Sequence, residues 1–461
     1  MESLRIAEIL KFCDGHLILG DPQDRISSIS LDSRNLKKNA LFIAIKGERY
    51  NGHKFLEEAL KKGAKGAVIN SKFKATKSLR AIAKQSHKIL IQVTDTRKAL
   101  GDIAQGYREK FKIPLIAITG SDGKTTTKEL AVSILSSRFH LVKNSGNFNN
   151  EIGLPLTLFK LTKRTNLAIV ELGMNRRGEI KRLSEIAEPT IGVITNIGES
   201  HQGFFKNRYG IAQSKAELLT SLGKSTVILN KDSDYFSFLK RRAKGRVITF
   251  GIKKKSDFQA KDIVLSSSGI EFRIGNLRIK VPLLGYFNVY NVLVAVALAK
   301  EFKIPPQEIK KKLQNFRPLL HHFQLIGSKK FRIIDDTYNS NPFAFRKAIE
   351  QLKMMKTKGR KVVIAGEMKE LGKFSEEAHY LIGEFIASSG IDFLVTVGKL
   401  AKEIGKGALQ NGFRKENFLH CQSNEEVVKS KRVFLEDDLI LVKGSRAAHL
   451  EEVVKEMKRQ T

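Results

Sequence analysis

A short glycine-bounded segment, residues 119–127, contains the residue types of a phosphate-binding loop. It reads Thr-Gly-Ser-Asp-Gly-Lys-Thr-Thr-Thr and lies between an apolar run and a helical pattern. In such a loop the backbone N–H groups and the start of the helix face an anion. The lysine would contact the outer phosphates, and the first threonine hydroxyl would bind Mg²⁺. We therefore predict nucleotide contacts from seven consecutive residues: Gly120, Ser121, Asp122, Gly123, Lys124, Thr125 and Thr126.

The spacing of this segment differs from the most common phosphate loop. That motif has four residues between its glycines and would need glycine at position 118, where this chain has Ile118. Here Gly120 and Gly123 enclose only two residues. The alternative interpretation is an ordinary strand-to-helix turn with a surface lysine. The apolar run before the loop and the Lys-Thr-Thr after it favour nucleotide binding.

Two further polar residues follow predicted strands. Glu171 comes directly after the run 166–170, and His201 ends the polar segment 195–201 after the run 191–194. Ligands bind beyond the carboxyl ends of strands in doubly wound sheets, so we expect both side chains near the phosphate loop, completing an Mg²⁺ shell. Taken singly, Glu171 is better explained as a capping or surface acid, and His201 as a loop histidine whose hydrogen bonds are satisfied.

The elements that must position these residues form three successive α/β groups. Residues 1–95 mix short β-rich runs, such as 26–31, with helical patterns. Residues 96–317 alternate strands and helices, with an antiparallel annex predicted over 250–281 and a helix over 288–302. The alternation starts again in residues 318–461. This pattern predicts an α/β fold of three domains whose sheets are mostly parallel and covered on both faces.

The bulk composition limits the class of protein. The chain has 461 residues, 41% of them hydrophobic, which is enough for several packed cores. Cys13 and Cys421 lie at opposite ends and form no CxxC pair, which is typical of a reducing compartment. The first residues form an amphipathic pattern rather than a signal peptide, and no apolar run is long enough to cross a bilayer. We expect a cytoplasmic protein without membrane insertion.

The chain is strongly basic, with 82 lysines and arginines against 47 acidic residues and a formal net charge of +35. One interpretation is a P-loop ATPase that is stimulated by nucleic acid. However, the basic residues are scattered, no basic cluster is interleaved with aromatic residues, and tryptophan is absent. We therefore expect no specific nucleic-acid partner, and a solvated basic surface that helps to hold substrates with several negative charges.

Several spaced motifs together resemble the Mur ligases, the ATP-dependent amide-forming enzymes of peptidoglycan precursor synthesis. The resemblance covers nearly the whole chain in the family's order. Besides residues 119–127, it rests on Ser-Leu-Asp-Ser-Arg (30–34), Leu-Phe-Ile-Ala-Ile-Lys-Gly-Glu-Arg-Tyr-Asn-Gly-His (41–53), Gly-Asn-Phe-Asn-Asn-Glu-Ile-Gly (146–153), Glu-Leu-Gly-Met-Asn (171–175), Gly-Glu-Ile (178–180), Asp-Asp-Thr-Tyr-Asn-Ser-Asn-Pro (335–342), Gly-Glu-Met-Lys-Glu-Leu-Gly (366–372) and Val-Lys-Gly-Ser-Arg (442–446).

The resemblance implies an enzyme that joins D-alanyl-D-alanine to the terminal carboxylate of UDP-N-acetylmuramoyl-tripeptide through an acyl phosphate, using ATP and Mg²⁺. We expect this enzyme to be a monomer. It also implies a small N-terminal module that binds the uridine nucleotide, a central P-loop ATPase sheet and a C-terminal Rossmann-like domain. The family's ligase for the third peptide residue is the nearest alternative. That ligase typically has Glu-Val-Ser-Ser-His at residues 171–175 and Tyr-Ala-His-Thr-Pro at residues 338–342, unlike this chain. Folylpolyglutamate synthetases share the ATP core but lack the N-terminal module.

The resemblance further implies roles for individual residues. Lys124, Glu171, His201 and Lys215 would be catalytic, with Lys215 carbamylated so that it binds metal beside Thr125, Glu171 and His201. Three further sets would bind substrates: nucleotide contacts from Asn288, Asn291, Asp336, Asn339 and Asn341, uridine-nucleotide contacts from Ser30, Asp32, Ser33 and Arg34, and muramyl-peptide contacts from Asn149 and Asn150. On its own, Lys215 is a surface lysine of a predicted helix, and residues 30–34 are equally well explained as a polar turn.

Two positions depart from the family pattern. His322 stands where many members have an arginine before the residue that opens the last domain, so a charged nucleotide contact would be weakened or supplied elsewhere. Glu367 stands where relatives usually have aspartate, and its longer side chain would shift the loop slightly.

Overall fold

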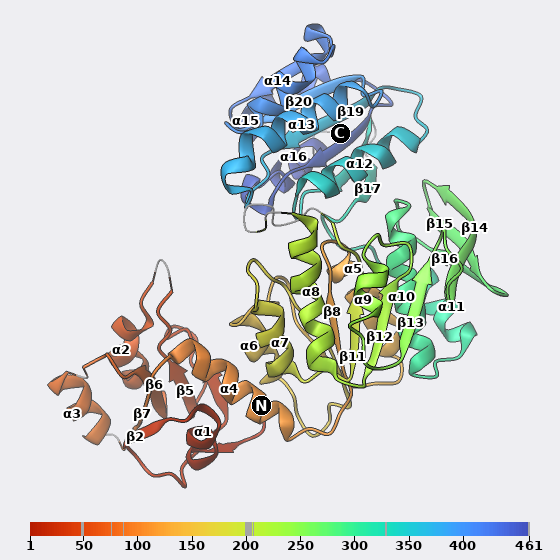
Figure 1. Ribbon diagram of the computed structural model, residues 1–461. Helices are drawn as coiled ribbons and strands as arrows, with labels where there is room; N and C mark the ends of the chain where they lie inside the picture. The colour runs from red at the N-terminus through yellow and green to blue at the C-terminus, as the bar shows by residue number, and fades with distance from the viewer. Residues whose placement is uncertain are drawn as a thin grey trace.

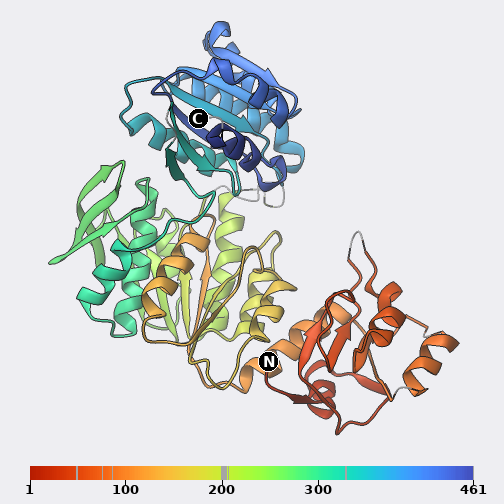
Figure 2. The same cartoon turned by 180° about the vertical axis from the view of Figure 1, so that it is seen from behind.

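Figure 1 shows three α/β lobes in chain order, with the central one between the other two. The computed structural model describes residues 1–47, 50–74, 76–85, 87–198, 205, 207–327 and 330–459. Each lobe has its own main sheet, and the view from behind shows the same arrangement (Figure 2). The predicted three-domain α/β architecture is therefore confirmed. The predicted divisions after residues 95 and 317 fall between the sheets, and their positions remain predictions.

The N-terminal lobe is built on a five-stranded sheet in the order β2-β7-β6-β5-β4. Strands β4 to β7 are parallel, and β2 pairs antiparallel with β7 at one edge. The bounds are His16–Leu19 (β2), Ser28–Ser30 (β4), Ala40–Ile43 (β5), Gly66–Asn70 (β6) and Ile89–Val93 (β7), with helices Ile6–Cys13 (α1), Leu56–Lys61 (α2) and Lys77–Gln85 (α3). The β-rich run predicted over 26–31 contains the end of one short strand and the whole of another, because the chain changes partner there: Arg25–Ile26 (β3) pairs with Leu4–Arg5 (β1) in a separate sheet, and β4 pairs with β5.

The central lobe contains a nine-stranded sheet in the order β16-β15-β14-β13-β12-β11-β8-β10-β9. Its six parallel strands are Leu115–Thr119 (β8), Leu141–Lys143 (β9), Leu167–Glu171 (β10), Ile191–Ile194 (β11), Thr226–Asn230 (β12) and Val247–Gly251 (β13). The annex consists of Phe258–Ser266 (β14), Gly269–Ile274 (β15) and Leu277–Val281 (β16). The prediction that the annex starts at residue 250 was wrong, because Phe250 pairs in parallel with β12 as part of β13.

Helices cover both faces of the parallel strands, which explains why those strands are apolar throughout. In β8, Leu115 and Ala117 belong to one core and Ile116 and Ile118 to the other, as the two-residue repeat of a strand requires. Over the second core lie the paired helices α5 and α10, and over the first lie α7 and α8. The helix bounds are Lys124–Leu135 (α5), Gly153–Leu158 (α6), Glu179–Ala187 (α7), Arg208–Leu222 (α8), Phe236–Lys240 (α9), Phe287–Glu301 (α10) and Pro306–Gln314 (α11).

The C-terminal lobe has a six-stranded sheet in the order β17-β18-β22-β19-β20-β21, parallel except for the edge strand β17. Its strands are Gln324–Gly327 (β17), Arg332–Asp336 (β18), Lys361–Gly366 (β19), Phe393–Val397 (β20), Phe418–Cys421 (β21) and Leu439–Lys443 (β22). Its helices are Pro342–Met354 (α12), Ser375–Ala387 (α13), Lys402–Gln410 (α14), Asn424–Lys429 (α15) and Glu451–Arg459 (α16). Separate apolar cores lie on the two faces of this sheet.

Helix α4 (Thr96–Glu109) is shared by the first two lobes. It packs against α1 on one side and against α6 and α7 on the other, and one apolar core runs through both lobes. The buried Arg108 guanidinium donates to the carbonyls of Ala187 (3.1 Å), Phe111 (2.5 Å) and Ile113 (2.9 Å), which fixes the chain between α4 and β8. The N-terminal and central lobes are therefore joined by buried contacts as well as by the chain.

Candidate active site

The phosphate loop connects β8 to α5 and requires glycine at both ends. Gly120 and Gly123 have φ angles of 152° and 78°, which glycine adopts without strain. A Cβ atom at Gly120 would lie 1.8 Å from Thr195 Oγ1, and one at Gly123 would lie 2.3 Å from Asn291 Oδ1. The loop therefore approaches its neighbours more closely than any other residue would allow.

The end of β11 holds the loop in place. Thr195 Oγ1 donates to the Asp122 carbonyl at 2.7 Å, and Asn196 Oδ1 accepts from the N–H groups of Ser121 (3.1 Å) and Asp122 (3.0 Å). Ser121 Oγ in turn accepts from Gly198 N at 2.8 Å. Thr195 and Asn196 were not among the predicted site residues, although both lie in the polar segment that follows the predicted strand.

Lys124 opens α5 and folds back over the loop. Its Nζ donates to the carbonyls of Gly120 (2.8 Å) and Ser121 (3.1 Å). Burial lowers the pKa of Lys124, and the nearby carboxylates of Asp122 and Glu171 oppose this shift. Thr126 follows in the first turn of the helix and is half-buried.

Glu171, at the end of β10, faces the start of the same helix. Its Oε2 accepts a hydrogen bond from Thr125 Oγ1 at 3.1 Å, and its side chain is 1% exposed. A carboxylate beside a hydroxyl at a phosphate loop provides the hard oxygen ligands that Mg²⁺ prefers. This proximity was predicted from the position of Glu171 at a strand end, and the role of both residues as metal ligands remains a prediction.

Lys128 is a further buried lysine in this cluster and was not among the predicted site residues. Its Nζ lies 2.8 Å from Glu171 Oε1, donates to the Asn144 carbonyl at 2.9 Å and lies 3.3 Å from Glu129 Oε1. The sequence feature that could have indicated Lys128 is its position four residues after Lys124, which places both lysines on one face of the helix.

Lys215 lies on α8 and is 1% exposed. Burial lowers the pKa of Lys215 well below its ordinary value; the positive charge of Lys124 lowers it further, and Asp122 opposes the shift. His201 lies outside the residues that the structure describes, so the predicted metal set is only partly visible. Within the described ranges, no group of three or more histidine, cysteine, aspartate or glutamate side chains is arranged to hold a metal ion.

Asn288 and Asn291 of α10 lie beside the phosphate loop. Asn291 Oδ1 accepts from Thr127 Oγ1 at 3.2 Å, and its Nδ2 donates to Asn288 Oδ1 at 2.7 Å. Both side chains are buried, and Asn288 Nδ2 donates to the Leu284 carbonyl at 2.7 Å. These bonds connect α10 directly to the phosphate-loop helix.

The C-terminal lobe contributes three more predicted residues, Asp336 at the end of β18 and Asn339 and Asn341 in the loop after it, and Asn341 bonds to the phosphate loop. Asn341 Nδ2 donates to Asp122 Oδ1 at 3.1 Å, which is a direct bond between the lobes. The same carboxamide caps α12 by accepting from Ala344 N at 2.8 Å. Lys443, at the end of β22, donates to Asp336 Oδ2 (2.6 Å) and to the Asn339 carbonyl (3.1 Å).

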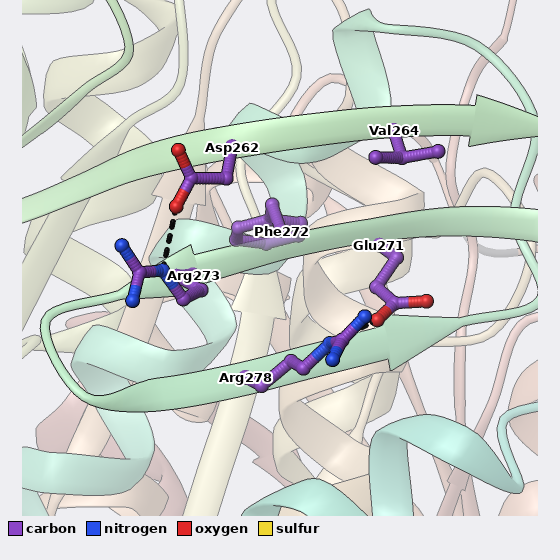
Figure 3. Close-up of a pocket in the computed structure, with 6 residues that line it drawn as sticks. All are labelled: Asp262, Val264, Glu271, Phe272, Arg273 and Arg278. Atoms are coloured by element: carbon purple, nitrogen blue, oxygen red, sulfur yellow. Dashed lines mark hydrogen bonds and ion pairs between the residues drawn. The ribbon is translucent and has the colours of Figure 1, made fainter.

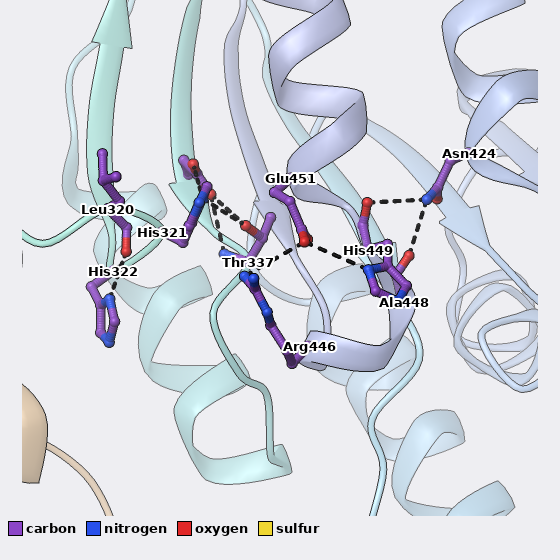
Figure 4. Close-up of polar contacts among 10 residues, drawn as sticks. Leu320, His321, His322, Thr337, Asn424, Arg446, Ala448, His449 and Glu451 are labelled. Atoms are coloured by element: carbon purple, nitrogen blue, oxygen red, sulfur yellow. Dashed lines mark hydrogen bonds and ion pairs between the residues drawn. The ribbon is translucent and has the colours of Figure 1, made fainter. Parts of the chain in front are cut away.

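His322, the position that departs from the family pattern, stacks on Tyr338 with ring centroids 4.2 Å apart. Its Nδ1 donates to the Leu320 carbonyl at 2.8 Å, and burial lowers its pKa. Figure 4 shows His321 turned toward Thr337 and the His322 ring turned away from it. His321 Nδ1 donates to Asp335 Oδ2 at 2.8 Å. An imidazole stacked on Tyr338, with a lowered pKa, therefore occupies the position where many family members have an arginine.

Residues 30–34 form a turn after β4 in the N-terminal lobe. The Arg34 guanidinium donates to both carboxylate oxygens of Asp32 at 2.9 Å and holds the pKa of Asp32 at about 2. Ser30 Oγ donates to the Asp32 carbonyl at 3.0 Å, and Ser33 Oγ donates to Glu58 Oε2 at 3.1 Å. These residues lie on a different sheet from the phosphate loop, and their predicted role remains untested.

Asn149 and Asn150 lie in the loop between β9 and α6. The Asn149 carbonyl accepts from Gly173 N at 2.8 Å. This loop is therefore hydrogen-bonded to the chain two residues after Glu171. Asn150 Oδ1 accepts from Ile152 N (3.1 Å) and Gly153 N (2.9 Å) at the start of α6.

A surface cavity of about 270 Å³ lies elsewhere, on the annex strands β14 to β16 (Figure 3). Asp262 and Arg273 form an ion pair on one side of it, and Glu271 and Arg278 form another. Strands β11 to β13 separate this annex from β8, so the cavity is not part of the cluster at the phosphate loop.

Comparison with known proteins shows the family to which this chain belongs. Three family models match in succession: "Mur ligase family, catalytic domain" over residues 25–108, "Mur ligase middle domain" over 118–299 and "Mur ligase, glutamate ligase domain" over 321–446. The UDP-N-acetylmuramoyl-tripeptide–D-alanyl-D-alanine ligase of Bacillus subtilis is 34% identical over 94% of each chain. The chain belongs to the Mur ligase family.

Other relatives of this Mur ligase agree over the full length. The ligase of the same name from Escherichia coli is 31% identical, covering 99% of this chain and 98% of its own. MurF from Acinetobacter baumannii superposes with a TM-score of 0.89 and 29% identity, covering 100% of this chain and 99% of that one. MurF from Thermotoga maritima in complex with ADP gives 0.81 and 26%, covering 94% and 97%. In the described part of this Mur ligase, no helix combines the length and apolar character needed to span a membrane.

Proposed function

We propose that this Mur ligase uses ATP to join D-alanyl-D-alanine to the terminal carboxylate of UDP-N-acetylmuramoyl-tripeptide in peptidoglycan precursor synthesis. Full-length relatives with this activity in their names support the assignment. The observation that carries the chemistry is the contact between Thr125 and Glu171 beside Lys124, at a glycine loop that opens a helix. This arrangement suits the transfer of a phosphoryl group.

The reaction needs an activated carboxylate. A peptide carboxylate is a poor electrophile, so transfer of the terminal phosphoryl group of ATP to it creates an acyl phosphate with a good leaving group. The amine of the dipeptide then attacks the acyl carbon, and phosphate leaves as the amide forms. In this scheme Lys124 and the loop N–H groups neutralise phosphate charge, and catalysis is mainly positioning.

The residues at the loop fit a magnesium ion. Thr125 and Glu171 would hold it and His201 would bind a second ion, with a carbamylated Lys215 as a further anionic ligand, and the ions would neutralise phosphate charge. Nucleotide contacts would come from Asn288 and Asn291 on one side. On the other side they would come from Asp336, Asn339 and Asn341, and the bond from Asn341 to Asp122 supports this assignment. The turn at residues 30–34 would bind the uridine nucleotide, and Asn149 and Asn150 the muramyl peptide.

We place the enzyme in the cytoplasm as a monomer acting on small molecules rather than on nucleic acid. Its basic residues are spread along the whole chain, and two cysteines give no disulfide framework. A nucleic-acid-stimulated ATPase remains the competing function because of the +35 charge.

Phosphate release from ATP and Mg²⁺ tests the proposal directly. Release should require both UDP-N-acetylmuramoyl-tripeptide and D-alanyl-D-alanine, and the product should be heavier by the dipeptide less water. Variation of the third peptide residue then ranks the acyl substrates. Release that ignores these compounds but responds to DNA or RNA would reject the ligase in favour of the competing function.

Replacement of Lys215 tests the carbamylated lysine. A lowered pKa keeps more of the amine neutral, and the neutral amine is the form that reacts with CO₂. Lys215→Ala should abolish phosphate release, and small carboxylates such as formate or acetate should restore part of it by replacing the missing anionic oxygen. Full activity without any carboxylate would remove Lys215 from the site.

A further inference from the structure

Asn144 is fully buried, and its side chain bonds both main-chain groups of Glu171. Its Oδ1 accepts from Glu171 N at 3.0 Å, and its Nδ2 donates to the Glu171 carbonyl at 3.2 Å. The second N–H of the carboxamide donates to the Phe148 carbonyl at 3.0 Å. Both donors and the acceptor of this side chain are therefore used.

These bonds continue the pairing of β9 with β10 after the main chain has left the sheet. The last residue of β9, Lys143, pairs with Ile169, and Glu171 lies two positions further along β10. At that point the Asn144 carboxamide supplies the donor and the acceptor that a peptide group would otherwise provide. Asparagine is the shortest side chain that carries a carboxamide, with the donor and the acceptor on separate atoms.

A second connection runs through Lys128. Its ammonium donates to the main-chain carbonyl of Asn144 at 2.9 Å and lies 2.8 Å from Glu171 Oε1. The main chain of Glu171 is thus held by Asn144 and its carboxylate by Lys128, which leaves Oε2 facing the Thr125 hydroxyl. Because the residues of this network are buried, loss of one partner would leave unpaired polar groups.

The loop that begins at Asn144 is tied to the same strand end from the other side. Phe148 accepts from the Asn144 carboxamide, and the Asn149 carbonyl accepts from Gly173 N. The loop 144–150 is therefore bonded both to Glu171 and to the residue two positions after it. This loop carries Asn149 and Asn150, which are assigned above to the muramyl peptide.

We infer that Asn144 is a positioning residue that joins the muramyl-peptide loop to the Glu171 carboxylate, so that both keep one relative geometry during phosphoryl transfer. This inference rests on the proposed function. Asn144 acts through Glu171 rather than on the reacting atoms. Its removal frees the strand end and the loop together, while the phosphate loop keeps its own bonds to Thr195 and Asn196.

A double-mutant cycle with Asn144→Ala and Glu171→Asp tests this route. Asn144→Ala should lower kcat for phosphate release about 10–100-fold, the range for groups that orient a metal ligand, with KM for D-alanyl-D-alanine unchanged. In the Glu171→Asp background, where the carboxylate is already displaced, the same change should cost less than threefold. Losses that multiply would show that Asn144 acts independently of Glu171 and would overturn the inference.

Titration with Mn²⁺ alone gives a readout that does not depend on turnover. Asn144→Ala should weaken Mn²⁺ binding about tenfold and speed hydrogen exchange at the Glu171 amide, and unchanged Mn²⁺ affinity would overturn the inference. Asn70→Ala is the matched control, because the Asn70 carboxamide also donates to one main-chain group and accepts from another, at Thr94 and Lys72. It should leave Mn²⁺ binding unchanged.

Two further comparisons keep the outcomes distinct. If Asn144→Ala does not fold, Asn144→Ser enters the same cycle and titration with the same expected outcomes. A wild-type enzyme that releases no phosphate with the ligase substrates would reject the proposed function, and the Mn²⁺ titration would still decide whether Asn144 positions Glu171.

Discussion

Burial of the Lys128 side chain costs free energy, yet this side chain orients the Glu171 carboxylate. A buried ammonium loses its hydration, and this cost is offset here by Glu171, the Asn144 carbonyl and Glu129. The geometry leaves Glu171 with one oxygen on Lys128 and the other on Thr125. The orientation of the carboxylate is thus set by a residue that lies one helical turn beyond the loop.

Removal of Lys128 should therefore destabilise the fold strongly. Lys128→Met leaves a buried carboxylate without its cation and should cost roughly 3–5 kcal/mol in the free energy of unfolding, measured with urea. Lys143→Met is the control, since it makes the same chemical change on the partly exposed partner of Glu129 and should cost about 1 kcal/mol or less. Equal losses in the two variants would contradict the buried pair.

Among the elements, α4 is unusual because it packs against helices of both the N-terminal and the central lobe, within one apolar core that the two lobes share. Its glycines permit close neighbours: a Cβ atom at Gly106 would lie 2.2 Å from the Phe12 ring of α1, and one at Gly101 would lie 2.7 Å from the Arg182 guanidinium. Glycine is a poor helix former, so its use here indicates that the packing distance matters more than helix propensity.

This packing predicts that the effect of Gly106→Ala on stability changes sign when Phe12 is replaced. Gly106→Ala should destabilise the protein although alanine favours the helix, because the added methyl overlaps the Phe12 ring. In a Phe12→Ala background the same substitution should stabilise by up to about 1 kcal/mol, since only the helix propensity remains. Thermal unfolding of the four proteins measures both effects. Destabilisation of equal size in both backgrounds would rule out the overlap as the cause.

For the whole molecule, the two junctions between lobes differ in kind. The chain between α4 and β8 is held by three bonds from the buried Arg108. The chain that enters the C-terminal lobe includes Leu320, which is 69% exposed, and the bonds from Asn341 to Asp122 and from Tyr286 to Gln351 cross this junction. Relative motion between the lobes is therefore expected at the second junction rather than the first.

Limited proteolysis tests this difference. Thermolysin should cut at Leu320 well before it cuts between residues 110 and 114, leaving the first two lobes together as one fragment. Arg108→Ala should make the 110–114 segment sensitive as well. Early cleavage between residues 110 and 114 in the unaltered protein would contradict the account of the first junction.

The phosphate loop and the approach of Glu171 to it were predictable from the sequence, whereas the bonds made by Asn144 and Asn196 were not. The phosphate loop was recognisable because glycines, lysine and threonine adjoin one strand and one helix. The approach of Glu171 to Thr125 followed from the rule that parallel strands end at one edge. By contrast, Asn144 and Asn196 bond residues 27 and 74–75 positions away, so their roles depend on register and on where each strand ends. No local pattern marks such pairings.

The clamp formed by Arg108 has a consequence for the length of molecule that the enzyme accepts. With the first two lobes fixed to each other, the span from the turn at residues 30–34 to the phosphate loop is a constant of the fold. Under the proposed assignment, a precursor anchored at its uridine end presents its far carboxylate at a reach set by the number of its peptide units. The protein would then select precursors by length. The carboxylate of a precursor one residue too short would not reach the phosphate, and that of a precursor one residue too long would lie beyond it.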